Sequence, residues 1–230
     1  MAFVFPLEML SQTPGLGTWN VLNVEINFND KWGAFYEGQL RSQKLYNHFF
    51  YHETKGGFSY SVAPKTSLLI GTGQFATYNF DGNFESPVLH ETRLWEQLTL
   101  TNEIGRFKLE HRYRIEQRFF TNGDYRNRFR YRLNALLPLN KEKIEKGAAY
   151  LNVFEEIFLT NTSPFFERSR TTAGIGYAFN NTLTMQLSYV YQYDFRRNLT
   201  TFNKHFLQTT VLIDINRSKT GMPRYPRIMD

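Results

Sequence analysis

The chain has 230 residues, no cysteine and a formal net charge of +6. The lack of cysteine excludes structural disulfides, thiolate metal sites and cysteine nucleophiles. The positive charges are interleaved with apolar residues along the chain, so we expect no nucleic-acid partner. Aromatic residues make up 17% of the chain while the mean hydropathy is −0.47, which indicates that aromatic and polar residues are sorted onto different faces of the fold.

The alternation of apolar and polar residues predicts an all-β chain. From Thr18 onward the pattern has a period of two, which is typical of β-strands. The sequence contains no run of roughly 18 apolar residues, the length that a membrane-spanning helix needs. Strands can cross a bilayer only as a closed barrel, because every backbone polar group must be paired there. The predicted fold class is therefore a transmembrane, antiparallel, up-and-down β-barrel.

Eleven strands are predicted in chain order. They span about residues 18–28, 32–42, 49–62, 66–79, 88–101, 106–120, 124–138, 148–160, 167–179, 182–195 and 203–215. Most exceed the roughly five or six residues usual in soluble sheets, and about 10 tilted residues cross a bilayer. Single-chain bacterial barrels have even strand numbers, so we expect about 10–12 strands in total, either ten or twelve, with twelve favoured.

Two kinds of connection alternate between these strands. Mostly tight turns are predicted at residues 29–31, 63–65, 102–105, 140–146 and 180–181. Longer links are predicted at residues 42–48, 81–87, 121–123, 161–166 and 196–202. Short turns at one end and longer loops at the other are typical of outer-membrane barrels.

The strand pattern places one barrel domain at residues 17–216, with an N-terminal segment at 1–16 and a C-terminal tail at 217–230. The start of the N-terminal segment is apolar, but it lacks a basic residue and contains Pro6 and Glu8. It is either the remnant of a signal peptide or an ordinary terminus.

Two neighbouring strands carry the clearest sorting of side chains. Between residues 106 and 132, arginine and glutamate alternate with aromatic and aliphatic residues. An arginine facing lipid near the midplane costs about 2–4 kcal/mol, so the charged rows must face the interior, where glutamates can pair with arginines of the next row. The residues expected to line the lumen are Arg93, Lys108, Glu110, Arg112, Arg114, Glu116, Arg118, Arg126, Arg128, Arg130, Arg132 and Glu156.

Other positions follow the same pattern less strictly. At the break in phase around residues 154–156, we expect Glu156 to face inward and Glu155 to lie near the lipid headgroups. Gly71 and Gly73 are expected to make room for bulky neighbours rather than to hold phosphate. Aromatic residues near strand ends are expected to form girdles at headgroup level, namely Trp19, Trp32, Tyr51, Tyr60, Tyr78, Phe179 and Tyr193.

An ordered set of motifs resembles a known family. The segments RLWEQL (93–98), RYRIEQRF (112–119), RNRFRYRL (126–133), YLNVFEEIFLTN (150–161) and SYVYQY (188–193) are similar to an outer-membrane β-barrel family of unknown function, of the DUF2490 type, common in Bacteroidota. The resemblance covers residues 17–216 and implies the fold and an outer-membrane location in Gram-negative cells. It implies no substrate and no catalytic residue.

No motif for catalysis stands out. None of the five histidines lies in a nucleophile motif, and the carboxylates among the arginines are better suited to ion pairs than to acid–base chemistry. No His or Asp cluster has metal-ligand spacing, so no catalytic residue, metal or cofactor is expected.

The sequence thus predicts a monomeric, porin-like outer-membrane protein in contact with lipid. Its role is either structural, with a packed interior, or that of a narrow arginine-lined pore for small anionic solutes. Two alternatives remain open at this stage. One is an outer-leaflet lipid-modifying enzyme with a Ser/His site at the loop end, and the other is a soluble ligand-carrying barrel.

Overall fold

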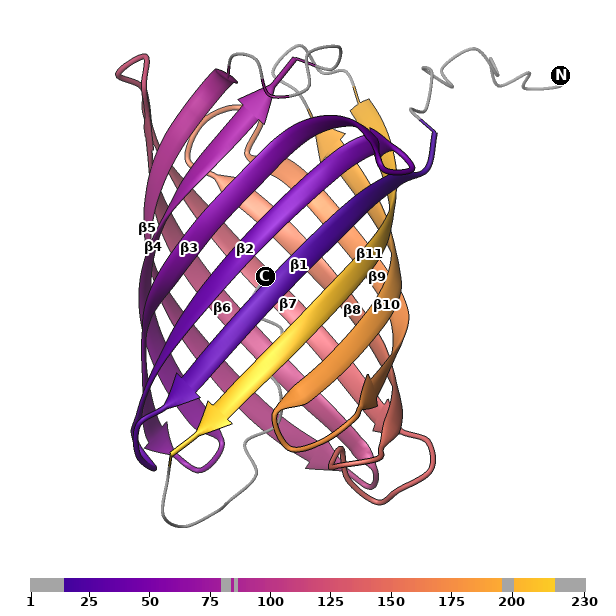
Figure 1. Cartoon of the computed structure of the whole chain (residues 1–230). Coiled ribbons are helices and arrows are strands. Elements are labelled where there is room, and N and C mark those ends of the chain that lie inside the picture. Colours follow the sequence, from indigo (N-terminus) through magenta and orange to yellow (C-terminus); the bar gives the residue numbers. More distant parts are fainter. Residues whose placement is uncertain (1–14, 80–83, 85–86, 196–200, 218–230) are drawn as a thin grey trace, which may run out of the picture.

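In the computed structural model, eleven β-strands form a closed barrel (Figure 1). The structure describes residues 15–79, 84, 87–195 and 201–217. The strands are β1 (Gly17–Asn27), β2 (Trp32–Lys44), β3 (Asn47–Ala63), β4 (Thr66–Tyr78), β5 (Pro87–Ile104), β6 (Phe107–Phe120), β7 (Tyr125–Pro138), β8 (Ala149–Thr160), β9 (Phe166–Ala178), β10 (Leu183–Phe195) and β11 (Thr201–Asn216). The all-β, up-and-down barrel predicted from the sequence is confirmed.

The barrel closes between its first and last strands. Consecutive strands pair antiparallel, whereas β1 and β11 pair in parallel, from Gly17 opposite Phe206 to Asn27 opposite Asn216. The expectation of ten or twelve strands is therefore wrong. With an odd number, the first and last strands run in the same direction, and a parallel ladder still pairs their backbone groups. An odd strand number also occurs in a mitochondrial barrel.

Parallel closure places the two ends of the barrel chain at opposite mouths. Strand β1 begins at the upper end of Figure 1, and β11 ends at the lower end. These two mouths are called the upper end and the lower end below. The N-terminal segment up to residue 14 and the tail from residue 218 lie outside the described residues.

The predicted strands lie within three residues of the observed ones at both ends. The predicted contrast between short turns and longer loops is wrong at two connections. The link expected at 42–48 is a turn at residues 45–46, because β2 and β3 extend toward each other. At the lower end, the connection between β7 and β8 spans residues 139–148. The loops expected at 81–87 and 196–202 fall largely outside the described residues.

Side chains alternate between the interior and the outer wall along the strands. In β6, exposed Tyr113 and Ile115 alternate with buried Arg112, Arg114 and Glu116, as the sequence pattern predicts. The same alternation continues through β7, β8 and β10. The wall is therefore apolar outside and charged inside, the reverse of a soluble barrel with an apolar core.

Two of the aromatic residues assigned to girdles face inward instead. Trp19 is 1% exposed and packs against Phe206, while the guanidinium of Arg41 lies 3.6 Å from the Trp19 ring and 4.3 Å from the ring of Tyr51. Proximity to a strand end did not reveal which face a ring occupies. Glu156 is fully buried, and Glu155 is exposed on the outer wall, where Thr171 donates a hydrogen bond to it.

Inward glycines make space for large side chains. A Cβ at Gly71 would collide with the indole of Trp95, and one at Gly73 would lie 2.6 Å from the Cβ of Lys55. Trp95 is 2% exposed and packs in an interior cluster with Phe35, Leu69 and Phe75. The expectation that these glycines accommodate bulky neighbours is confirmed.

Candidate functional site

The candidate site is the charged interior of the barrel. Eleven of the twelve residues expected to line the lumen are buried, each 8% exposed or less. They are Arg93, Lys108, Glu110, Arg112, Arg114, Glu116, Arg118, Arg128, Arg130, Arg132 and Glu156. Arg126 is half-buried at the upper end, where it pairs with Asp124.

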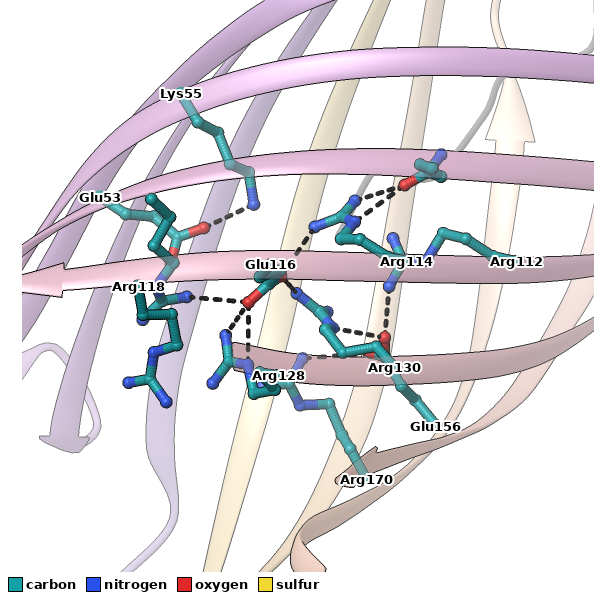
Figure 2. A network of polar contacts seen from close by, with 12 residues as sticks. Glu53, Lys55, Arg112, Arg114, Glu116, Arg118, Arg128, Arg130, Glu156 and Arg170 are labelled. Atoms are coloured by element: carbon teal, nitrogen blue, oxygen red, sulfur yellow. Dashed lines mark hydrogen bonds and ion pairs between the residues drawn. The ribbon is translucent and has the colours of Figure 1, made fainter. Parts of the chain in front are cut away.

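Strand register places several arginines directly opposite one another. The pairs are Arg112 with Arg132, Arg114 with Arg130, and Arg118 with Arg126. Like charges in such positions are destabilising, so carboxylates must lie between them. For the first two pairs, the buried glutamates Glu116 on β6 and Glu156 on β8 provide these carboxylates (Figure 2). Arg118 pairs instead with Glu91 and Glu167.

Glu116 accepts hydrogen bonds from arginines on two strands. Arg128 donates through Nε at 2.8 Å and through a second nitrogen, and Arg130 donates at 2.7 Å. Arg114 lies 3.4 Å from Oε1 and Arg93 4.0 Å from Oε2. One carboxylate, 1% exposed, is thus shared by four guanidinium groups (Figure 2).

Glu156 is a second carboxylate shared by several arginines, and it lies closer to the lower end than Glu116 does. Arg112 donates to Oε1 at 2.5 Å, and Arg130 donates to the same oxygen through Nε at 2.9 Å. Arg170 lies 3.6 Å from Oε2. Arg130 therefore bridges Glu116 and Glu156 and links the two carboxylates into one charge network. Glu116, Glu156 and Arg130 are each 5% exposed or less, so the network lies buried inside the lumen.

Above the network lies a cavity of about 210 Å³, called the upper cavity here. Its walls include eight cationic and three acidic side chains. The cationic ones are Arg41, Arg93, Arg118, Arg128, Arg130, Arg168, Arg170 and Lys204, and the acidic ones are Glu53, Glu91 and Glu167. Phe50, Tyr51, Phe158 and Phe206 form aromatic parts of the wall.

Half of the cationic wall lies outside the set of residues that the sequence predicted to line the lumen. Arg168 and Arg170 lie on β9, Lys204 on β11 and Arg41 on β2. Their period-two spacing was visible, since Arg168 and Arg170 stand two residues apart, but each row holds too few charges to identify its face. Glu167 was also missed, because a register shift between Phe158 and Leu159 lets its carboxylate reach Arg118 and Arg128.

The lower part of the interior holds amide side chains and the buried ion pair between Lys108 and Glu110, whose nitrogen and oxygen lie 2.7 Å apart. Asn152 donates to the side-chain oxygen of Asn134 at 2.5 Å, and Gln186 donates to that of Asn152 at 3.2 Å. Ile144, from the loop between β7 and β8, is buried against Leu136 and Tyr150. This loop places an apolar side chain inside the lower mouth.

An arginine fastens the same loop across the lower end. Arg106 donates hydrogen bonds of 2.7 Å to the backbone carbonyls of Pro138 and Lys141. Lys141 in turn pairs with Glu145 at 3.1 Å within the loop. The loop thus has both an apolar anchor inside the barrel and a polar anchor at its rim.

Three histidines pair with tyrosines. His52 contacts the hydroxyl of Tyr78 at 3.0 Å, His111 that of Tyr131 at 2.9 Å, and His205 that of Tyr189 at 2.5 Å. Among the described residues, no group of three His, Asp or Glu side chains is arranged to hold a metal ion.

Within the part of the chain that the structure describes, no helix has the length and apolar character needed to cross a membrane.

Comparison with known proteins gives a family and no closer relative. The profile of a family described as "Protein of unknown function (DUF2490)" matches residues 16–203, from just before β1 into β11. No curated protein matches the chain significantly. No solved structure does so either.

Proposed function

We propose that this chain, which belongs to the DUF2490 family of proteins of unknown function, is an outer-membrane β-barrel of a Gram-negative bacterium, with an interior closed to free diffusion. The outer wall carries the proposal. Every strand exposes at least one large apolar side chain, so the apolar surface surrounds the whole barrel. These residues include Leu22, Tyr36, Phe58, Ile70, Leu94, Ile115, Phe129, Val153, Ile175, Leu187 and Ile215.

Such a surface suits lipid better than water. Monomeric soluble proteins rarely expose contiguous apolar patches beyond about a few hundred Å². A protein partner would cover one side of the barrel, whereas lipid covers all sides. The closed ladder between β1 and β11 also leaves no unpaired strand edge to recruit a second copy, which favours a monomer.

Aromatic pairs at both ends of the outer wall fit this placement. At the lower end, the rings of Trp32 and Tyr60 lie 4.8 Å apart, and at the upper end those of Tyr193 and Phe195 also lie 4.8 Å apart. Amphipathic rings at headgroup level are typical of membrane barrels. The assignment to Bacteroidota rests on the resemblance of residues 112–119 and 150–161 to proteins of that phylum.

A closed interior follows from the packing below the upper cavity. The charge network, the amide side chains and the inserted Ile144 occupy successive levels between the two mouths. The carboxylates Glu116 and Glu156 hold their arginines toward one another, which leaves these side chains little freedom to move aside. The barrel therefore serves as a structural or ligand-binding protein of the membrane rather than as a diffusion pore.

Fractionation of cells that produce the full chain tests the location. We expect the protein in the outer-membrane fraction, resistant to carbonate extraction, and with different gel mobility before and after boiling. A variant with Ile115→Lys and Phe129→Lys on the outer wall should lose membrane integration, because each midplane lysine costs about 2–4 kcal/mol. The matched variant Lys65→Gln, at the lower rim, should integrate normally. Recovery of folded wild-type protein in the soluble fraction would contradict the proposal and favour a soluble carrier.

A further inference from the structure

The upper cavity lies close to the upper mouth. Glu91 and Arg93 are near the start of β5, Arg168 is near the start of β9, and Lys204 is near the start of β11. All of these strand starts lie at the upper end (Figure 1). A small solute that arrives at this mouth meets the cavity before it meets the packed interior.

Positive charge exceeds negative charge in the cavity wall. Eight cationic side chains face three carboxylates. Three further carboxylates, Glu116, Glu156 and Asp194, contact these cations from outside the lining. Counting them leaves eight cations against six carboxylates. The excess persists because Glu116 and Glu156 are also shared with arginines outside the lining, Arg114 and Arg112.

Four arginine side chains gather around the ring of Phe158, which indicates that this region has more cations than carboxylates. The guanidinium carbons of Arg130 and Arg170 lie 4.6 and 5.0 Å from the centroid of Phe158, and those of Arg128 and Arg168 lie 5.4 and 5.5 Å from it. A ring face attracts a cation more weakly than a carboxylate does. Four cations around one ring repel one another in a partly desolvated space, which a bound anion would relieve.

We propose that the upper cavity binds a small anion with at least two negative charges, a phosphate ester or diphosphate. Guanidinium groups favour this chemistry, because their paired N–H donors match the oxygens of a phosphoryl group. A cavity of about 210 Å³ has room for more than a single oxyanion, and the rings of Phe50 and Phe206 can contact an organic part of the ligand. This inference goes beyond the proposed membrane role, since binding depends on the cavity alone.

Purified full-length protein in a neutral detergent provides the test, with inorganic pyrophosphate and glucose 6-phosphate as probes and glucose as the uncharged control. Calorimetric titration at low salt should detect binding of both phosphates and none of glucose. Added sodium chloride should weaken the binding, because charge attraction supplies it. Failure of both phosphates to bind would overturn the proposal.

A comparison of two variants tests whether pyrophosphate binds in the upper cavity. Lys204→Gln removes one cation from the wall and should weaken pyrophosphate binding by about ten-fold or more, the worth of one charge-assisted hydrogen bond. Lys65→Gln makes the same chemical change at an exposed position of the lower rim, 58% accessible, and should bind like the wild type. Equal affinity of the two variants would contradict the assignment. Gel mobility before and after boiling shows whether each variant is folded.

A competition experiment distinguishes a lipid headgroup from a soluble phosphate ester as the ligand. Lysophosphatidic acid, below its micelle concentration, presents a phosphomonoester on a lipid. If it displaces pyrophosphate more tightly than glucose 6-phosphate does, the cavity takes a lipid headgroup. If it competes more weakly, the ligand is a soluble phosphate ester. Both results support the phosphate chemistry, and failure of all three probes rejects it.

Discussion

The upper and lower halves of the barrel interior differ in how well their polar side chains are matched with partners. Near the upper end, eight cations surround a cavity of about 210 Å³. Near the lower end, the amides of Asn134, Asn152 and Gln186 bond to one another, Glu110 pairs one to one with Lys108, and Ile144 is inserted from a loop. The same strands form the wall of both halves, so the side chains inside decide whether a cavity is left.

The contrast has a simple electrostatic cause. An amide both donates and accepts hydrogen bonds, so a few amides can satisfy one another and pack closely. A guanidinium only donates, and arginines pack closely only where carboxylates lie between them. In the charge network, Glu116 and Glu156 are the carboxylates that lie between the arginines. Above them cations outnumber carboxylates, and their side chains surround a cavity.

The largest effect is expected when the shared carboxylate is neutralised. Glu116→Gln leaves four buried arginines without their common partner, and the removal of one member of a buried ion pair costs about 3–5 kcal/mol. The urea midpoint of unfolding in detergent, followed by tryptophan fluorescence, should fall strongly. The control Glu103→Gln, at an exposed pair with Lys65, should leave the midpoint almost unchanged. Equal midpoints for both variants would show that the network does not stabilise the upper half.

Truncation of the inserted loop residue should have the next largest effect. Ile144→Ala removes buried apolar contacts with Leu136 and Tyr150, at a cost of about 2–4 kcal/mol. It should also speed hydrogen exchange of the loop amides at residues 139–148. Leu139→Ala, at a residue 49% exposed in the same loop, is the matched control. An unchanged midpoint for Ile144→Ala would mean that the lower mouth is not held closed by this side chain.

A smaller loss is expected from the amide chain. Asn152→Ala removes the contacts to Asn134 and Gln186 and leaves buried polar atoms unpaired, which costs about 1–3 kcal/mol. The same unfolding assay measures it. Pyrophosphate should raise the midpoints of this variant and of the wild type by the same amount, because the lost contacts lie away from the cavity. A smaller or larger shift in the variant than in the wild type would contradict the separation of the two halves.

The exposed ion pair of the lower loop should matter least. Lys141 and Glu145 are 36% and 57% accessible, and surface pairs contribute about 0–1 kcal/mol. Lys141→Ala should therefore shift the unfolding midpoint only slightly. A loss as large as that of Glu116→Gln would show that exposure does not separate weak from strong pairs in this barrel.

Much of the wall could be predicted from the sequence. Period-two alternation identified all eleven strands, and the cost of an arginine in lipid assigned the inward face of β6 and β7. The inward faces of β6 and β7 could be assigned because charged residues, mostly arginine, occur at nearly every second position over a long run. The even strand number was an expectation taken from other barrels, and nothing in the chain itself supported it.

The cavity could not be predicted in the same way. Its residues come from ten strands, β2 to β11, and converge only after closure, so no local pattern contains it. Glu167 enters the interior through a register shift, and Trp19 and Tyr51 lie near strand ends where both faces accept an aromatic ring. Charge alternation shows whether a side chain faces the interior or the outer wall, but not its position along the barrel axis.

Permeability of proteoliposomes tests the central contrast most directly. The full chain is reconstituted into liposomes, insertion is verified by flotation, and efflux of entrapped chloride and glucose is measured. We predict efflux no faster than from protein-free liposomes, because the lower half of the interior is filled. Rapid chloride efflux from wild-type proteoliposomes, reduced in the double variant Arg128→Ser and Arg130→Ser, would contradict this account and establish an anion pore.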